Sequence, residues 1–322
     1  MRTGVDPVIG YLIRRLIQTV IVTLLVTMIT FLLLHLVPGG PLRALLGPKA
    51  TQGEIAHFNV LYGYNRPLYV QYGKWIWQLL HGNLGYSVHL NVSVASQIGQ
   101  DLPKTMVLLG LGLVVSMIFG IPLGIYQAVR RYTVGDYVLT GISFIGYATP
   151  AFFTGILLVD WFAVELKIFP PFAPQGNSVG QVLSQPSALV LPVLTVAFLQ
   201  YAIWSRYMRS SVLDNIVQDY VRTARAKGAS ERRVLLGHVF RNSLITIVTL
   251  LGLGLPGLVG GAVVIEVVFN YPGMGLLFYQ AALNVDYQML LGITVIATVV
   301  TILGNLAADL GYAMLDPRVR YS

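Results

Sequence analysis

The residues best suited to binding a charged partner are concentrated between residues 206 and 241. Basic side chains recur through this segment, and Gly228 interrupts it. Its basic residues are Arg206, Arg209, Arg222, Arg225, Lys227, Arg232, Arg233 and Arg241. Side chains of this kind contact anionic lipid head groups, nucleic acid or the acidic surface of another protein. Charge alone does not decide among these partners.

Catalytic chemistry finds little support in the sequence. The chain has no cysteine, which excludes thiolate nucleophiles, thiolate metal sites and disulfides. No Gly-x-x-x-x-Gly-Lys-Ser/Thr loop that could cradle phosphates occurs, because Lys104-Thr105 follows Pro103 rather than glycine. The histidines are scattered and form no group of nucleophile and base or of metal ligands: His35, His57, His81, His89 and His238. We therefore expect no catalytic, cofactor-binding or metal-binding residue in this chain.

Three acidic residues stand within or beside long apolar stretches. Asp160 and Glu266 lie near the outer ends of their stretches, and Asp309 lies near an inner end. Ionisable groups at membrane depth are candidates for a transport pathway. Their closeness to the membrane interfaces favours hydrogen bonding at helix ends, and a place in the pathway remains the alternative.

The elements that position these residues are predicted to be membrane-spanning helices. The chain is 55% hydrophobic and 11% charged, with a mean hydropathy of +0.70, whereas about a quarter of the residues in a soluble domain are charged. Apolar stretches of about 17–25 residues suffice to cross the hydrocarbon layer as helices. The sequence predicts an all-α membrane protein with six transmembrane helices, near 13–37, 104–129, 137–163, 187–208, 244–269 and 288–312.

The distribution of charge predicts the orientation of these helices. With the N-terminus inside, most of the chain's 21 Lys and Arg fall on cytoplasmic segments, which is the usual bias of membrane proteins. The basic residues left outside are Arg43, Lys49, Arg66, Lys74, Lys104 and Lys167. We therefore expect a multi-pass protein of the cytoplasmic membrane with both termini in the cytoplasm. The net charge of +8 is then an orientation signal, and nucleic acid is not an expected partner.

The chain divides by composition into two parts. Residues 1–103 are predicted to hold the first helix and a long extracytoplasmic segment, and residues 104–322 the remaining five helices with a cytoplasmic loop at 206–243. The outer segment is rich in aromatic residues, and residues 67–80 resemble a short helix with an aromatic face. Such a helix either lies on the outer membrane surface or forms a docking surface for an extracytoplasmic partner.

The cytoplasmic loop has the pattern of two helices separated by a glycine. Apolar residues at helical spacing define one face: Ile216, Val217, Tyr220, Val221 and Ala224. Gly228 is placed to end this helix in the left-handed conformation, which costs glycine nothing. Ser230 is expected to cap a second helix whose first turn contains Glu231. A loop that only joined two helices could be much shorter.

The residue order of this loop resembles the cytoplasmic loop of ABC importer permeases, and most closely that of the first permease of the dipeptide, oligopeptide and nickel group. The resemblance rests on Asp219-Tyr-Val-Arg-Thr-Ala-Arg-Ala-Lys-Gly228 together with His238 and Arg241-Asn-Ser-Leu-Ile245. It extends over nearly the whole chain through further motifs: Arg14-Arg15-Leu16, Val37-Pro-Gly-Gly-Pro41, His81-Gly-Asn-Leu-Gly-Tyr-Ser87, Gly120-Ile-Pro-Leu-Gly124, Glu266, Tyr271-Pro-Gly-Met-Gly275 and Asp316-Pro-Arg-Val-Arg320.

The resemblance implies the type I ABC importer permease fold and a transport function. It implies a sister permease, two ATPase subunits that bind ATP and magnesium, a substrate-binding protein on the outer face, and a peptide substrate. It also implies that the loop contains a helix that docks on an ATPase. The residues to which this coupling role is carried over are Asp219, Tyr220, Arg222, Thr223, Ala224, Arg225, Ala226, Lys227 and Gly228.

Two departures and two alternatives accompany this interpretation. Arg222-Thr223-Ala224 replaces the Glu-Ala-Ala of the wider superfamily, and Thr246 replaces a proline usual after the loop. An ion-coupled secondary transporter is a rival class, although such proteins usually show inverted repeats and ionisable residues near the midplane. Nickel or another small solute is an alternative substrate, and no residue is predicted to contact the substrate.

Overall fold

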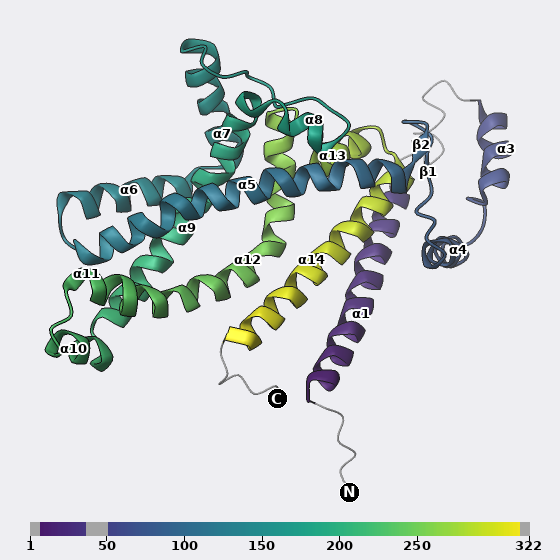
Figure 1. The fold of residues 1–322 in the computed structure, drawn as a ribbon. Coiled ribbons are helices and arrows are strands. Elements are labelled where there is room, and N and C mark those ends of the chain that lie inside the picture. Colours follow the sequence, from purple (N-terminus) through teal and green to yellow (C-terminus); the bar gives the residue numbers. More distant parts are fainter. Residues whose placement is uncertain (1–6, 37–50, 316–322) are drawn as a thin grey trace, which may run out of the picture.

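The computed structural model describes residues 7–36 and 51–315. Within them, the side chains of residues 7–13, 15, 34, 62, 249, 252–261 and 307–315 are not described. The structure is almost entirely helical, with one short hairpin (Figure 1). Its helices are α1 (Pro7–His35), α3 (Gln52–Tyr62), α4 (Leu68–Leu80), α5 (Val94–Val129), α6 (Val134–Ala148), α7 (Ala151–Val159), α8 (Val179–Leu183), α9 (Pro186–Ile216), α10 (Asp219–Ala226), α11 (Glu231–Arg233), α12 (Phe240–Val268), α13 (Met274–Leu283) and α14 (Tyr287–Leu315). Two π-helical turns, η1 (Asp160–Glu165) and η2 (Val234–Val239), extend α7 and α11, and strands β1 (Tyr86–Ser87) and β2 (Val92–Ser93) pair antiparallel.

The helices long and apolar enough to cross a membrane agree in part with the predicted six. Among the described residues, four such spans lie in α1, α5, α9 and α14, and a bent pair of α6 and the run 151–165 raises the number to five. The predicted fifth span falls in α12, a helix of 29 residues whose central side chains are outside the described part. The described residues therefore form a mostly helical architecture with four to five candidate spans.

The predicted third span, 137–163, is not one straight helix. It breaks between α6 and α7, and the two parts are bent by 109°. Thr149, which precedes Pro150, adopts an extended conformation with φ −83° and ψ 127°. The proline ring disfavours the helical conformation at the residue before it, and the helix ends there.

Two other predicted spans are shorter than the helices that form. α5 begins at Val94 rather than at residue 104, so the predicted division of the chain between residues 103 and 104 falls inside α5. α9 continues to Ile216 instead of ending near 208. Polar and charged residues in the added turns hide this continuity from a hydropathy pattern, whereas helical backbone bonding does not depend on it.

Helices α5 and α9 pack closely together, and glycines on α5 make their contact possible. A Cβ atom at Gly120 would lie 2.8 Å from Trp204 Cβ, and one at Gly124 would lie 2.5 Å from the carbonyl oxygen of Ser205. Small residues let helix backbones approach in lipid, where association depends on packing and polar contacts. The Gly120-x-x-x-Gly124 spacing seen in the sequence thus lies in a tight interface.

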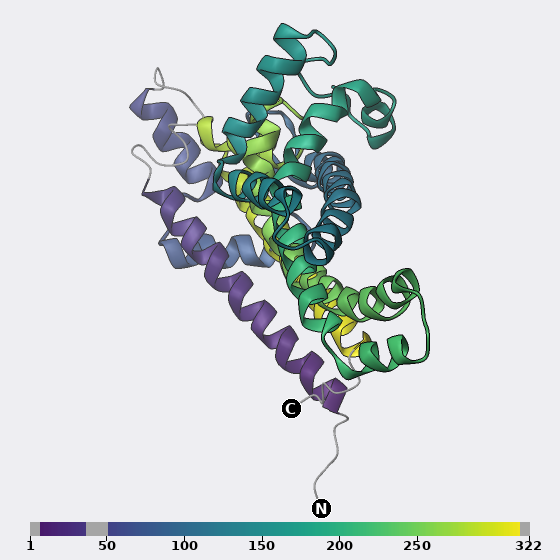
Figure 2. The ribbon, with the colours of Figure 1, turned by 90° about the vertical axis from the view of Figure 1, so that its left-hand side faces the viewer.

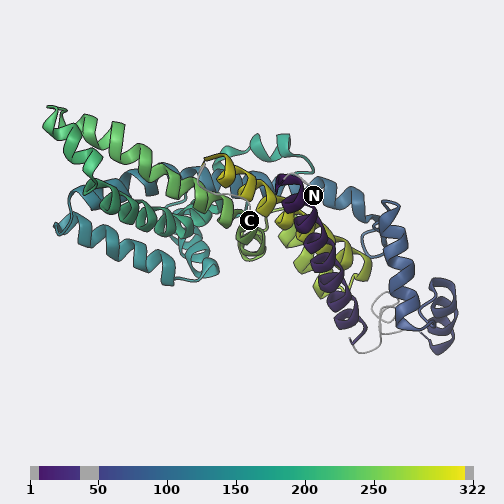
Figure 3. The ribbon, with the colours of Figure 1, turned by 90° about the horizontal axis from the view of Figure 1, so that it is seen from below.

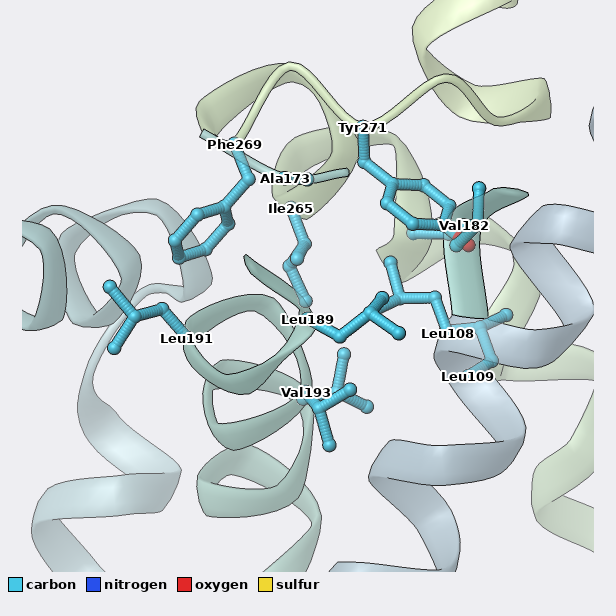
Figure 4. Packing of buried hydrophobic residues seen from close by; sticks show 12 residues of the cluster. Leu108, Leu109, Ala173, Val182, Leu189, Leu191, Val193, Ile265, Phe269 and Tyr271 are labelled. Atoms are coloured by element: carbon cyan, nitrogen blue, oxygen red, sulfur yellow. The ribbon is translucent and has the colours of Figure 1, made fainter. Parts of the chain in front are cut away.

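The main buried cluster joins α5, α9 and α12 (Figure 4). Leu108 from α5, Leu191 from α9 and Phe269 after α12 are all almost fully buried within it. Ala173 joins the loop 166–178 to this cluster, because its amide donates to the carbonyl oxygen of Phe269 at 2.8 Å. The cluster holds the ends of three long helices in fixed relation.

The outer segment contains the predicted helix and a second one that was not predicted. α4 (Leu68–Leu80) matches the expected 67–80, with Trp75 buried. α3 starts with a capping box between Thr51 and Glu54, for which the Thr-x-x-Glu spacing is a signal in the sequence. The Thr51 amide and hydroxyl donate to the Glu54 carboxylate and lower the pKa of that group.

The elements are distributed between two ends of an elongated molecule. In Figures 1 and 2 the first turns of α1, the last turns of α14 and helix α10 lie toward the bottom, whereas α8, α13 and the hairpin lie toward the top. Seen from below, α10 and α11 stand at the opposite side from α3 and α4 (Figure 3). The loop at 206–243 and the outer segment are thus well separated.

Candidate functional site

Helix α10 ends at a glycine in the conformation that the sequence predicts. Gly228 has φ +77°. Its amide donates to the carbonyl oxygen of Arg225 at 2.9 Å, and the amide of Ala229 donates to that of Ala224 at 3.2 Å. These are the two bonds of a Schellman motif, which satisfies the last carbonyl groups of a helix. The prediction of a left-handed glycine is confirmed.

The inner face of α10 is anchored by a smaller set of residues than predicted. Val221 is completely buried and belongs to one apolar cluster with Val234 and Val239 of η2, and Ile216 and Ala224 are partly buried against that cluster. Val217 and Tyr220, which the pattern assigned to the same face, are exposed. Val217 lies between α9 and α10 rather than in either helix, and the hydroxyl of Tyr220 donates to Asn215 Oδ1 at 2.8 Å.

The other residues predicted to couple form the outward face of α10. Asp219, Tyr220, Arg222, Thr223, Arg225, Ala226 and Lys227 are all exposed. Arg225 makes two hydrogen bonds to Glu231, at 2.8 and 3.1 Å, and so fixes the start of α11 against the end of α10. Arg222 and Asp219 lie 3.4 Å apart, a pair that is largely exposed and contributes little to stability.

The predicted cap of the second helix is wrong in its chemistry. Ser230 occupies the N-cap position, but its hydroxyl makes no capping hydrogen bond. Glu231 in the first turn is held by Arg225 instead. The second helix was expected to be a separate element, and the structure has only three α-helical residues before the π turn η2.

This short helix connects the loop directly to α12. α11, η2 and α12 follow one another without a break from Glu231 to Val268. π turns of this kind are found mostly inside longer helices and often at functional positions. α10 therefore lies beside the beginning of one long helical run.

Glu266 lies at the far end of that run and caps another helix. It is fully buried and accepts hydrogen bonds from the amides of Gly275 at 2.7 Å and Leu276 at 3.0 Å. Thr105 Oγ1 donates to the same carboxylate at 2.6 Å and accepts from the amide of Met274. The carboxylate thus satisfies the first amide groups of α13 and ties α5, α12 and α13 together.

The structure does not bring the three acidic candidates to one place. Asp160 lies at the start of η1, whereas Glu266 is enclosed at the end of α12. Asp309 belongs to α14, and its side chain lies outside the described residues. Among the side chains that are described, no group of three or more His, Asp or Glu could hold a metal ion.

Two ion pairs with buried members were not predicted. Lys104, which was counted with the basic residues outside at the start of the predicted second span, is buried in α5 beside Asp101, with 2.8 Å between Nζ and Oδ1. Arg209 of α9 holds Asp136 of α6 through two hydrogen bonds of 3.0 and 3.2 Å. The i,i+3 spacing of Asp101 and Lys104 is a usable signal in the sequence. The members of the second pair are 73 residues apart, so no local spacing in the sequence predicts their contact.

The chain matches known families along almost its whole length. Residues 120–321 match the family described as the inner membrane component of binding-protein-dependent transport systems. Residues 8–109 match the N-terminal family of the same membrane components.

Individual relatives agree with this match. The chain is 38% identical to the oligopeptide transport system permease protein AppB of Bacillus subtilis, over 97% of this chain and 99% of the relative. It is 35% identical to the glutathione transport system permease protein GsiC of Escherichia coli, over 98% of this chain and 100% of the relative. Its fold is similar to a chain of the inward-facing MetNI methionine ABC transporter, with a TM-score of 0.55, 16% identity, and coverage of 68% of this chain and 96% of that one. The chain therefore belongs to the family of inner membrane components of binding-protein-dependent transport systems.

Proposed function

We propose that the chain is the permease subunit of an ATP-driven importer of peptides. The family and the oligopeptide permease named above support the transport of peptides. The sequence has no phosphate-binding loop, so the energy has to come from partner subunits. The proposed assembly contains a sister permease, two ATPase subunits that bind ATP and magnesium, and an extracytoplasmic substrate-binding protein.

The proposed topology has six spans with both termini in the cytoplasm. α12 is the sixth span, in addition to α1, α5, α9, α14 and the bent pair of α6 and residues 151–165. The concentration of Lys and Arg in the loop 206–243 favours the cytoplasmic side for this loop. The first turns of α1 and the last turns of α14 lie toward the same end of the molecule as α10, which supports this arrangement (Figures 1 and 2).

The observation that carries the coupling proposal is the construction of α10. A short helix exposes a polar face while Val221 and the turn at Gly228 attach its other side to the helical run 231–268. An ATPase that docks on this face and closes on ATP transmits its movement into α12. The spans then exchange between inward- and outward-facing arrangements, because the partners bind one arrangement more tightly than the other.

Cross-linking tests the docking surface directly. Because the chain has no cysteine, Arg222→Cys introduces a unique thiol on the outward face of α10. In the assembled transporter, we expect this variant to cross-link to a cysteine placed on the ATPase subunit, with a yield that changes when ATP is added. Lys167→Cys, an exposed position in the loop predicted to lie outside, is the matched control. Cross-linking of the control to the ATPase, or none from Arg222→Cys, contradicts the proposal.

A further inference from the structure

A large cavity lies between α1, α12, α13 and α14, and the coupling proposal does not use it. Its volume is about 860 Å³, within the range of about 300–1,000 Å³ for ligand sites. α1 and α14 run side by side, with α12 beyond α14 (Figure 1). The cavity extends from Thr105 and Gly275, beside the cap made by Glu266, to Gln18 and Asn305.

A line of uncharged polar side chains follows one face of α14 through this cavity. These side chains are Thr294, Thr298, Thr301 and Asn305, which recur at intervals of three and four residues and so share one helix face. From the first to the last, the helix rises about 16 Å at 1.5 Å per residue. That distance is about half of the hydrocarbon thickness of a membrane.

Two hydroxyl groups of this line donate to the helix backbone and can still accept hydrogen bonds. Thr294 Oγ1 donates to the carbonyl oxygen of Leu290 at 2.8 Å, and Thr298 Oγ1 donates to that of Thr294 at 2.7 Å. Because each hydroxyl has one donor and two acceptor positions, both retain acceptor capacity. The side-chain amides of Asn305 and Gln18 offer both donors and acceptors and have no hydrogen bond within the described part of the chain.

The lining is mostly apolar with one line of uncharged polar groups, which suits a peptide chain in transit more than a tightly held charged solute. No Asp, Glu, Lys or Arg is among the described lining residues. Uncharged donors and acceptors match the peptide groups that every peptide has in common, whatever its side chains. An extended chain advances about 3.3 Å per residue, so about five residues fit along the polar line. Weak contacts repeated along a path permit passage, whereas strong ones would retain the ligand.

We propose that this cavity is part of the transport path and that the polar line on α14 contacts the backbone of the peptide. The proposal deepens the proposed function and rests on it. Two other occupants are conceivable, a lipid chain and a helix of the sister permease. Both would exclude water from the polar line, and this difference separates them from a peptide path.

Thiol labelling in the assembled transporter tests the path. Thr298→Cys and Thr301→Cys place a thiol on the polar line with little change in volume, and Leu303→Cys, whose native side chain is 58% exposed, places one on the opposite face of α14. Only a thiolate reacts, which requires water. We expect a membrane-impermeant methanethiosulfonate to label both test positions at least about tenfold faster than Leu303→Cys. Tetra-alanine should slow the labelling while ATP drives its uptake.

The outcomes distinguish this proposal from the function on which it rests. Labelling of both test positions no faster than that of Leu303→Cys overturns the path, because lipid or a sister helix then fills the cavity. Fast labelling that tetra-alanine does not slow, although the complex transports tetra-alanine, overturns the contact with peptide. If the complex transports neither tetra-alanine nor any other short peptide, peptide transport itself fails, and the labelling ratio alone decides whether the cavity is a water-filled path.

Discussion

Replacement of Gly228 by valine would strain the turn that presents α10 without creating a clash. A Cβ atom at this position meets nothing within 4 Å, so neighbouring side chains add no penalty. The cost comes from the backbone, because φ is +77° and the left-handed conformation costs an L-residue roughly 1–2 kcal/mol. For valine we expect a cost at or above the upper end of this range, because a β-branched side chain is especially disfavoured in the left-handed conformation. A change of about one to two kcal/mol lowers the population of the native turn by about 5- to 30-fold relative to its alternatives.

The size of the effect should follow the backbone preference of the new residue. Asparagine enters the left-handed region more readily than other non-glycine residues. We therefore expect ATP-dependent uptake per inserted complex to decrease in the order Gly228, Gly228→Asn, Gly228→Ala, Gly228→Val, with the valine variant at less than about a tenth of the native rate. Insertion should be unchanged in all of them. The assay is peptide uptake into proteoliposomes, normalised to the amount of assembled complex, with ATP hydrolysis measured in parallel.

A second glycine provides the matched control. Gly82 has φ +78° and also leaves nothing within 4 Å of an added Cβ atom, but it precedes the hairpin in the outer segment. Gly82→Val therefore imposes the same kind of strain far from α10, and we expect it to leave the stimulation of ATP hydrolysis intact. Native uptake by a fully assembled Gly228→Val complex would refute the coupling role. Equal losses of hydrolysis in both variants would show that strain acts through general stability.

Three further substitutions test the polar and close-packed contacts of the fold. Glu266→Leu leaves buried amides of α13 without an acceptor, at about 1–3 kcal/mol for each, so the apparent melting temperature of the purified chain should fall. Gly124→Val places side-chain atoms against the backbone of α9, where a Cβ would already lie 2.5 Å from a carbonyl oxygen. It should lower the amount of folded chain recovered by gel filtration. Gly110→Val is the control, because a Cβ there meets nothing within 4 Å, and it should leave this amount unchanged. Arg209→Ala leaves the buried carboxylate of Asp136 unpaired and should destabilise the chain by up to about 3 kcal/mol, less than a fully buried pair because Arg209 is 32% exposed. Chemical unfolding in detergent measures this loss, and Asp136→Asn combined with Arg209→Ala should recover part of it.

The sequence was sufficient for features that depend on local order. Apolar runs of membrane length predicted the long helices, because every backbone group in lipid has to be paired within its own segment. The glycine at the end of α10 was also predictable from local order, because its left-handed conformation depends on the preceding helix alone. Pro150 also broke the helix before it, although the angle of the break depends on what packs around it.

Long-range contacts were out of reach of one sequence. The hydrogen bond from Thr105 to Glu266 joins residues 161 positions apart in the chain. Val217 and Tyr220 fit one apolar face in the sequence, but both are exposed, because α9 ends at Ile216 and α10 begins only at Asp219. The polar line on α14 has a helical period that is visible in the sequence, but only the structure shows that these residues line a cavity.

The two proposals meet in α12. Its N-terminal extension begins at the turn that Arg225 and Glu231 hold beside α10, and its other end carries Glu266. Thr105 and Gly275, the hydrogen-bond partners of Glu266, are also residues that line the far end of the cavity. Because one helical run connects these positions, we expect a tilt imposed at α10 to reach the end of the cavity lined by Thr105 and Gly275. If both proposals hold, we expect energy supplied at α10 to open or close the path near Thr105 and Gly275 through this helical run.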